Sequence, residues 1–432
     1  MTNFQLWPLV AAVSLASTGL AQAGVGEPSV WSFSGFGTLA AVHSSEKEAD
    51  FIGSNQQPNG AGRTHATSLA PDSKLGAQIS AQFTPELSAV LQVMAQHQYD
   101  NRWTPQLEWA NVQYRFSPAL RVRVGRIVMP TNLVSQSRHV GYANPWVRPP
   151  QEVYGSNSIT SNDGIDAAYV ATFGDAVNTL SGFYGSGTAK LAPATGGTAK
   201  ANPSRGINNT LAMGETTLRI GFLSTKLDLD VPHLQALIGG FNGFGAAASA
   251  IPVASIQAAG AQAYALAQTY ALQGMSRQTL SIAALHDTGD WFVMGEFSHF
   301  MGKSLFANAN YGYATAGYRH GPWTPYATLA GFKTTARTEP GIATAGLPAQ
   351  LAAGAAQLNA GLNTTLAAAA AASQKSLSLG LRWDFMKNAA AKLQYDHIDL
   401  GANATGPTTN RSSSYRPGGN VNLVSVAVDF VF

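Results

Sequence analysis

Several segments of this chain alternate apolar and polar residues with a period of two. The last eleven residues read NLVSVAVDFVF, in which Ser425 and Asp429 interrupt a run of apolar side chains at every second position. The segments 74–83 (KLGAQISAQF) and 376–385 (SLSLGLRWDF) repeat the pattern. A period of two is typical of β-strands whose two faces meet different surroundings. The sequence therefore predicts many two-faced strands.

Composition decides which surroundings these are. Only 11% of the 432 residues are charged, well below the roughly one quarter usual in soluble domains. A mean hydropathy of −0.02 is too low for a bundle of membrane helices, and no internal stretch offers the ~20 consecutive apolar residues of such a helix. These features indicate an all-β, antiparallel transmembrane barrel, with apolar side chains facing lipid and polar ones facing the interior.

A soluble sandwich also alternates, but two features favour the barrel. The polar faces carry Arg, Lys, Asp and Gln, as a wet interior would. Aromatic residues stand near predicted strand ends, as in the girdles of membrane barrels. These aromatics are Trp31, Phe83, Trp103, Trp109, Trp291, Trp383 and Phe385.

The N-terminus is predicted to be an export signal. Residues 6–16 form a short apolar core, and Ala-Gln-Ala at 21–23 is a small-residue cleavage site. Residues 1–23 lack the usual Lys or Arg. We expect a cleaved signal peptide, 1–23, followed by one barrel domain, 24–432. The absence of cysteine excludes disulfides and thiol chemistry.

Short and long connections alternate along the chain, as in bacterial outer-membrane barrels. Seven short turns and eight long connections predict about sixteen strands. The predicted short turns are 84–85, 117–118, 174–175, 224–225, 287–290, 321–323 and 386–388. The predicted long connections are 44–73, 97–104, 127–163, 186–214, 233–276, 300–306, 333–375 and 399–421.

Two of the long connections contain Ala-rich segments, 246–272 and 342–373, with Leu at helical spacing. Alanine is the best helix former, so these loops are predicted to carry short helices. They are either low-complexity surface insertions or elements that pack at the mouth of the barrel.

Motifs of catalysis, metal binding and nucleic-acid binding are missing. The chain has no G-x-S-x-G elbow, no H-E-x-x-H and no phosphate-binding loop. Its nine His residues are scattered, and its net charge of +3 comes from dispersed Lys and Arg. We therefore expect no enzyme activity, no cofactor, no metal and no nucleic-acid partner.

Basic residues share one face of two consecutive strands. Arg115 ends the segment 106–116, and LRVRVGR at 120–126 places Arg121 and Arg123 opposite Leu and Val. Side chains on the same face of adjacent strands lie within reach of one another. We predict a positive cluster in the interior, with Arg126 as a further lining candidate. The alternative is a set of ordinary solvated charges in a wide channel.

The connection 128–164 follows that strand directly. It contains four prolines and carries Arg138, Arg148, Glu152 and Asp163, and Asp166 lies on the next predicted strand. Proline and aromatic residues favour a defined conformation, so we predict a structured loop, whose charged side chains are candidates for the pore lining if the loop folds inward. An ordinary external loop is the alternative.

The segments SLSLGLRWDFMKNAAAKLQYDHIDL and SVAVDFVF resemble the closing strands of Gram-negative outer-membrane porins, and VGRIVMPTNLVSQSRHVGYANPWVRPPQEVYG resembles the segment that follows strand five in such proteins. The resemblance implies that 128–164 folds inward and narrows the pore. It also implies that Glu152, Asp163 and Asp166 are acidic partners of Arg115, Arg121 and Arg123. Phe432 would be the terminal aromatic that the barrel-assembly machinery reads.

The predicted function is a water-filled pore of the bacterial outer membrane, through which small hydrophilic solutes and ions diffuse passively. The last strand would pair with the first near 30–37 and face lipid through Val424, Val426, Val428 and Phe430. A homotrimer is one assembly that the resemblance allows. Alternatives are a pore specific for an anion or organic acid, a surface adhesin or structural barrel, and a barrel hydrolase.

Overall fold

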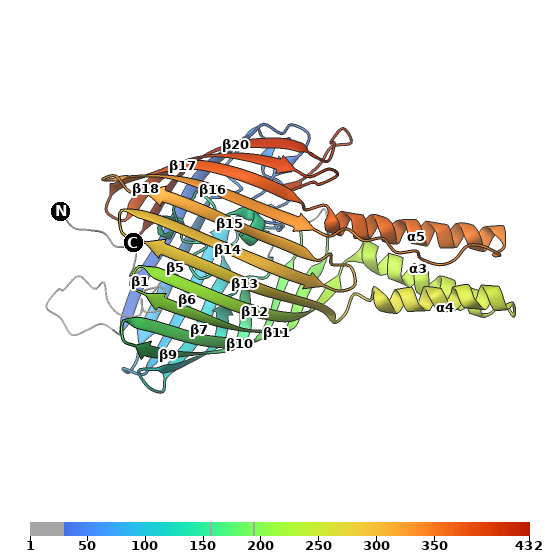
Figure 1. The fold of residues 1–432 in the computed structure, drawn as a ribbon, viewed down its shortest axis with the longest axis horizontal. Coiled ribbons are helices and arrows are strands. Elements are labelled where there is room, and N and C mark those ends of the chain that lie inside the picture. The colour runs from blue at the N-terminus through green and yellow to red at the C-terminus, as the bar shows by residue number, and fades with distance from the viewer. Residues whose placement is uncertain (1–29, 156–157, 193–194) are drawn as a thin grey trace.

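The computed structural model describes residues 30–155, 158–192 and 195–432, which form one closed β-barrel (Figure 1). The predicted signal peptide, 1–23, lies outside the described residues. Within them, sixteen long antiparallel strands build the wall. These strands are β1 (Trp31–Ser44), β5 (Lys74–Gln82), β6 (Leu87–Gln96), β7 (Gln106–Arg115), β8 (Leu120–Val128), β9 (Ser161–Phe173), β10 (Ala176–Lys190), β11 (Thr198–Met213), β12 (Thr216–Asp230), β13 (Met275–Asp287), β14 (Trp291–Gly302), β15 (Ala309–Tyr318), β16 (Trp323–Thr334), β17 (Gln374–Met386), β18 (Ala389–Leu400) and β20 (Gly419–Val431).

The first and last strands close the barrel. β1 pairs with β20 from Phe36 opposite Val431 to Ser44 opposite Leu423. The beginning of β1 pairs with β5 on its other side, starting with Trp31 opposite Ala81. Because every long strand has a neighbour on both sides, the wall leaves no open edge. The predicted antiparallel barrel of sixteen strands is confirmed.

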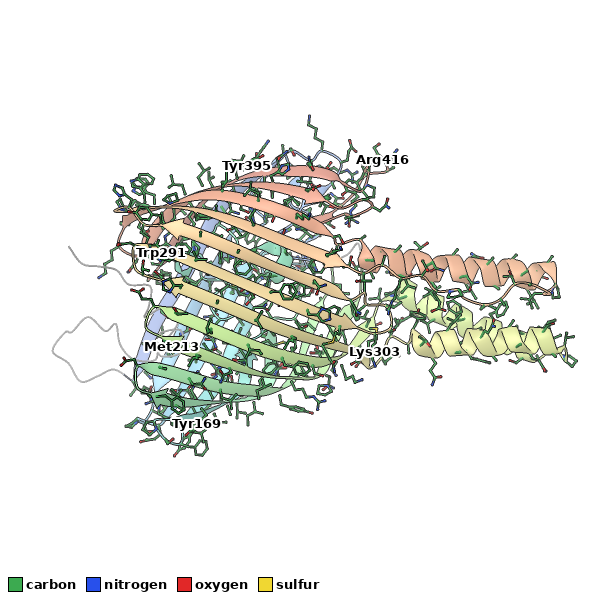
Figure 2. All side chains as sticks on the ribbon, viewed as in Figure 1. Tyr169, Met213, Trp291, Lys303, Tyr395 and Arg416 are labelled. Atoms are coloured by element: carbon green, nitrogen blue, oxygen red, sulfur yellow. The ribbon has the colours of Figure 1, made fainter. Side chains whose placement is uncertain are left out.

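The barrel is apolar outside and polar inside. On β20, Val424, Val426 and Val428 are 45%, 49% and 42% exposed, whereas Ser425 and Asp429 are fully buried. Figure 2 shows other large side chains on the outer surface, among them Tyr169 and Trp291. This distribution is the reverse of that in a soluble sandwich, as the sequence pattern predicted.

The aromatic residues near strand ends follow this distribution with one exception. Trp31, Phe83, Trp291 and Trp383 are each at least 40% exposed. Trp109, in contrast, is only half-exposed and lies opposite Gln92, whose buried amide donates a hydrogen bond to the interior residue Gln78. Trp109 therefore belongs to the inner face and not to an outer girdle.

Short turns gather at one end of the barrel and long connections at the other (Figure 1). Six predicted turns are confirmed, but the turn predicted at 224–225 is wrong. That position lies inside β12, and the turn is formed by Gly214 (φ +51°) and Glu215. The long loop predicted at 186–214 is likewise wrong, because β10 and β11 occupy most of it and leave only residues 191–197 between them.

Several connections carry structure of their own. Two long ones contribute three long helices, and the loop after β8 contains two short helical turns. None of the described helices is long and apolar enough to span a membrane. The additional elements are β2 (Asp50–Phe51), β3 (Ala61–Gly62), β4 (Thr67–Ser68), η1 (Gly141–Ala143), α2 (Gln151–Tyr154), α3 (Pro232–Ser249), α4 (Ala254–Thr269), α5 (Ala349–Ala370) and β19 (Thr408–Thr409).

Helices α3, α4 and α5 extend away from the barrel on the side of the long connections (Figure 1). They pack together around an apolar core that includes Phe241, Ala263, Leu362 and Leu366, each almost fully buried. The prediction of helices in the Ala-rich segments is confirmed, but the helices are long and α3 begins at Pro232, well before the predicted segment. They do not fold across the barrel interior.

Candidate functional site

The loop between β8 and β9, described at residues 129–155 and 158–160, crosses the interior of the barrel. Trp146 near its middle is 1% exposed, and its indole nitrogen donates hydrogen bonds to Thr315 on β15 (3.2 Å) and Thr328 on β16 (2.9 Å). In the strand order these two strands stand opposite β8. The loop therefore reaches from one wall of the barrel to the other.

A buried lysine holds the centre of the loop. The Nζ of Lys392 on β18 donates hydrogen bonds of 2.8 Å to the carbonyl oxygens of Gly141, Asn144 and Trp146. The same ammonium lies 2.7 Å from the carboxylate of Asp429, and both side chains are 0% exposed. Loop carbonyls without a β-ladder partner need such donors when they are buried. Lys392 thus satisfies three of them while Asp429 balances its charge.

Arg382 on β17 supports the same stretch. Its guanidinium donates to the carbonyl oxygens of Tyr142 (2.7 Å) and Asn144 (3.0 Å), and it also pairs with Asp384 (2.7 Å). Two cations of the wall therefore fix the backbone of residues 141–146.

Arg148 anchors the loop by its own side chain. It forms ion pairs with Asp72 (2.7 Å) and with Asp396 on β18 (2.5 Å), and it donates to the hydroxyl of Ser425 (2.5 Å). Burial opposes the charge of the guanidinium, but the two carboxylates outweigh it and raise the pKa of Arg148. Arg148 is only 5% exposed. Its predicted role in the lining is therefore corrected: its charge is neutralised in a structural cluster.

Glu152 does not meet the arginines that the resemblance assigned to it. Its carboxylate accepts hydrogen bonds from Gln374 (2.8 Å) and Ser376 (2.7 Å) on β17, and burial raises its pKa. The arginines stand on β7 and β8, in the other half of the wall. The expected pairing of Glu152 with Arg115, Arg121 or Arg123 is thus wrong.

A glutamate that the sequence did not single out holds the start of the loop. The carboxylate of Glu296 on β14 accepts hydrogen bonds from the Asn132 side chain (2.9 Å) and from the backbone N–H of Leu133 (2.5 Å). It also accepts from the hydroxyl of Tyr154 (3.2 Å). On the neighbouring wall, Arg219 of β12 donates to the carbonyl oxygen of Pro130. Charges on the inner faces of β12 and β14 were the only sequence signal for these contacts.

The predicted basic cluster lies on the inner face of β7 and β8. Arg115 stands directly opposite Arg121 in the strand register, and Arg123 stands opposite Gln113. Val124, the next residue in β8, is 56% exposed on the outside, so Arg123 points to the inside. Like charges in directly opposite positions repel each other, and the carboxylate of Asp166, opposite Arg123, offsets part of this repulsion.

The acidic residues of β9 divide between the two faces. Asp166 lies opposite Arg123 and accepts two hydrogen bonds from its Nε (2.9 and 3.1 Å) in the interior. Arg126 and Asp163 form an ion pair of 2.6 Å, but they share the face of Val124 and Ile165, which are exposed on the outside. The strand register therefore places this pair outside the barrel and corrects the expectation that both residues line the pore.

Arg138 and His139 lie in the loop near the inner face of β7. The Arg138 guanidinium donates to the carbonyl oxygen of Tyr154 (3.5 Å), and His139 Nε2 lies 3.7 Å from Glu108. Burial, together with the positive charges of Arg138 and Lys74, places the pKa of His139 well below its usual value. His139 is therefore neutral at pH 7 and adds no charge to this region.

Phe432 closes the last pairing of the wall. Its backbone N–H donates to Gly35 (3.0 Å), and its carbonyl oxygen accepts from the N–H of Gly35 (2.8 Å). The ring covers the face of Gly35, where a Cβ atom would approach the ring to 2.2 Å. Among the described residues no group of three or more His, Asp or Glu side chains is placed to hold a metal ion.

Comparison with known proteins gives matches at the level of structure. The sequence matches no protein-family model and no curated protein. Similar solved structures include OmpF of Salmonella typhi in complex with daunomycin (11% identity, 93% of this chain and 97% of that chain, TM-score 0.52). DcaP, an outer membrane channel of Acinetobacter baumannii, is also similar (11%, 95% and 100%, 0.52).

An anion-selective porin of Comamonas acidovorans is a third similar structure (13% identity, 93% of this chain and 99% of that chain, TM-score 0.50). At these identities the likeness concerns the fold alone. The resemblance to porins drawn from the terminal strands is confirmed to that extent, and the chain has the sixteen-stranded barrel fold of outer-membrane porins.

Proposed function

We propose that this protein is an outer-membrane porin, a water-filled channel for the passive diffusion of small hydrophilic solutes and ions. The observation that carries the proposal is a closed barrel that is apolar outside and polar inside. Such a surface matches lipid hydrocarbon, and such an interior favours water and hydrated solutes. In this proposal residues 1–23 are removed on export and residues 24–432 form the barrel in the outer membrane.

The proposed mechanism is sieving by width and charge, without a catalytic step. The loop between β8 and β9 is anchored on β12, β14–β18 and β20. This supports a passage on the opposite side of the interior, along β7 and β8, where Arg115, Arg121 and Arg123 project. Rings of basic side chains favour anions in a pore. Glu152 and Asp163 do not face these arginines, and Asp166 offsets the charge of Arg123 only, so the three arginines and this aspartate together keep a net positive charge. We therefore infer a preference for anions, including small organic acids.

Single-channel recording tests the function directly. Purified, folded protein in planar bilayers should produce discrete conductance steps, with an anion permeability greater than that of cations in a potassium chloride gradient. Folded barrels that give no steps would contradict the channel, and steps with a cation preference would contradict the charge assignment alone.

Removing two arginines should shift the ion selectivity. In the variant Arg121→Ala/Arg123→Ala, we expect the reversal potential in a salt gradient to move toward cation preference. One charge about 7 Å from an ion contributes roughly 0.6 kcal/mol in water, which changes the partition of one ion about threefold. Because anions and cations change in opposite directions, each loss should change the anion-to-cation permeability ratio by up to about sevenfold at low salt. The matched control is Arg126→Ala, which removes the same charge from the outer face. An unchanged reversal potential in the double variant would exclude these arginines from the lining.

Deleting Phe432 should impair insertion into the outer membrane more than it alters conductance. The deletion removes the last backbone pair with Gly35, and we propose that it also removes the aromatic signal for the assembly machinery. The measurement is the amount of heat-modifiable barrel in membrane fractions, with Phe432→Trp as a control that keeps an aromatic. Normal insertion of the deletion variant would contradict the role. Refolding into detergent without the machinery separates loss of the signal from loss of the pairing.

A further inference from the structure

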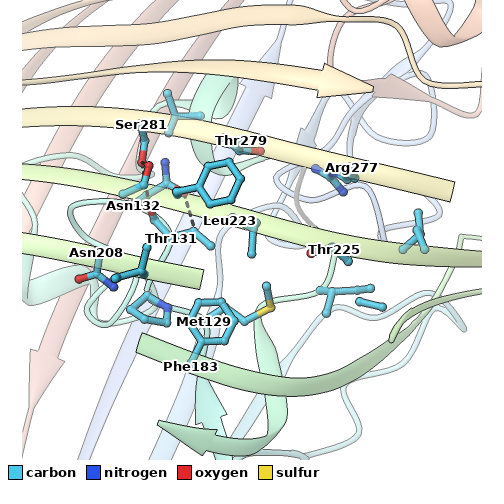
Figure 3. Close-up of a pocket in the computed structure, with 18 of the residues that line it drawn as sticks. Met129, Thr131, Asn132, Phe183, Asn208, Leu223, Thr225, Arg277, Thr279 and Ser281 are labelled. Carbon is cyan, nitrogen blue, oxygen red and sulfur yellow. Dashed lines mark hydrogen bonds between the residues drawn. The ribbon is translucent and has the colours of Figure 1, made fainter. Parts of the chain in front are cut away.

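A second polar site lies on the other side of the loop, away from the basic cluster. A cavity opens between the two ends of the loop and the inner faces of β10–β13 (Figure 3). The loop contributes Met129 and Asn132, and the wall contributes Phe183, Leu223 and Arg277. The site thus combines one cation with apolar and polar side chains.

Arg277 is the unusual member of this cavity. Its Nε is buried without a hydrogen-bond partner, and its guanidinium carbon lies 5.0 Å from the ring centre of Phe300. Within the described parts of the chain, no carboxylate lies within 4.0 Å of this guanidinium, whereas Arg148 and Arg319 have Asp partners. Arg277 is only partly exposed, and an arginine with reduced access to water and no counter-ion is costly, because its charge is incompletely solvated. The interior therefore has a position for an anion that the chain itself does not fill.

The neighbouring polar groups also favour an acceptor. Asn208 is 5% exposed, and its Nδ2 has no hydrogen-bond partner although its Oδ1 accepts from Ser181 (2.8 Å). The orphaned atoms of Arg277 and Asn208 are thus both N–H donors. Thr279 and Ser281 follow Arg277 at every second position on the same inner face of β13. A ligand that accepts hydrogen bonds would satisfy donors that now have no partner.

The middle of the cavity is apolar. In Figure 3, Met129, Phe183 and Leu223 lie between Asn208 on one side and Arg277 on the other. Met129 and Phe183 are 5% and 7% exposed and belong to one apolar cluster. A small hydrated ion such as chloride would gain little from these walls, whereas an apolar body would lose unfavourable contact with water.

We propose that this cavity binds a small carboxylate with an apolar body. The carboxylate pairs with the guanidinium of Arg277, and the body packs against Phe183, Met129 and Leu223. The Nδ2 of Asn208 donates to a polar group at the far end of ligands that carry one. The site requires the folded barrel but not conduction, so its test is independent of the proposed channel function.

The test is titration of benzoate into detergent-solubilised full-length protein, followed by calorimetry. We expect saturable binding, and we expect Arg277→Gln to weaken it about tenfold or more, because a charge-assisted contact is lost. Acetate, which keeps the charge without the body, and benzamide, which keeps the body without the charge, should both bind far more weakly. Arg205→Gln is the matched control, since Arg205 shares the outer face with Ile207 and Tyr184.

Thermal unfolding provides a second reading that does not depend on one variant. Benzoate should raise the Tm of the wild-type protein, whereas acetate at the same concentration should leave it nearly unchanged. Without ligand, Arg277→Gln should unfold at the same or a higher temperature, because it removes an uncompensated charge. Absence of saturable benzoate binding to the wild type, equal binding by Arg277→Gln, or equal binding of acetate would each overturn the proposal.

Discussion

Replacing Lys392 with Met is expected to lower the free energy of unfolding by about 3–5 kcal/mol, the range for breaking a buried ion pair on one side. Methionine preserves most of the volume of the side chain but leaves the carboxylate of Asp429, which is 0% exposed, without its cation. The carbonyl oxygens of Gly141, Asn144 and Trp146 lose their donor in the same step. Urea unfolding of the protein in lipid vesicles, followed by tryptophan fluorescence, measures the effect.

Two further variants identify the cause of that loss. Lys375→Met removes a lysine from an exposed position on the adjacent strand β17, and we expect its stability to equal that of the wild type. The double variant Lys392→Met/Asp429→Asn should recover part of the loss, because the uncompensated carboxylate disappears while the loop carbonyls remain without a donor. If Lys392→Met alone proved as stable as the wild type, the buried pair would not anchor the loop.

The barrel itself could be predicted from the sequence because its signals are local. Alternation in segments such as 74–83 and 376–385 reports which side chains of a strand face outward, and each strand needs only its neighbour to form a ladder. Tight turns such as that at 386–388 leave little choice of connection. The strand count followed from this pattern even though one turn was misplaced.

The misplaced turn has a physical reason. β11 contains Pro203 and a register shift between Ala201 and Ser204, where it pairs with β12. Proline is tolerated in strands at such irregularities, but in a sequence it indicates a loop. Ser224 and Thr225 then resembled a turn, although Thr225 is buried and its hydroxyl lies 3.1 Å from that of Ser204.

The anchors of the inner loop could be predicted only in part. Lys392, Asp396 and Asp429 can be assigned to inner faces from the sequence, because these charges alternate with apolar residues. Lys392 lies 246 or more residues along the chain from the loop carbonyls that it contacts. Asp396 lies 248 residues from Arg148. No local pattern links positions so distant, so the pairing of Glu152 with the arginines was assigned from resemblance alone and was wrong. For the same reason the sequence could not show that Arg277 lacks an acidic partner, because that depends on residues distant in the chain.

Removing the inner loop should increase the single-channel conductance by at least about twofold, because the loop crosses the interior through which ions would pass. Val128 and Ser161 are partners in the register of β8 and β9, so a short Gly-Ser linker can replace residues 131–158 without stretching the wall. The side chains that anchored the loop, such as Lys392 and Glu296, would then meet water in the interior and would not remain buried without partners. Conductance steps in planar bilayers give the measurement.

The control removes a larger amount of chain, but from outside the barrel. Excision of residues 233–270 and 340–372 deletes α3, α4 and α5 together, so that no helix keeps an uncovered apolar face. Because these helices extend away from the barrel (Figure 1), conductance should stay close to that of the wild type. A loop-deleted barrel that conducts like the wild type would show that residues 131–158 do not narrow the passage. Equal increases from both excisions would assign the narrowest point to the external helices instead.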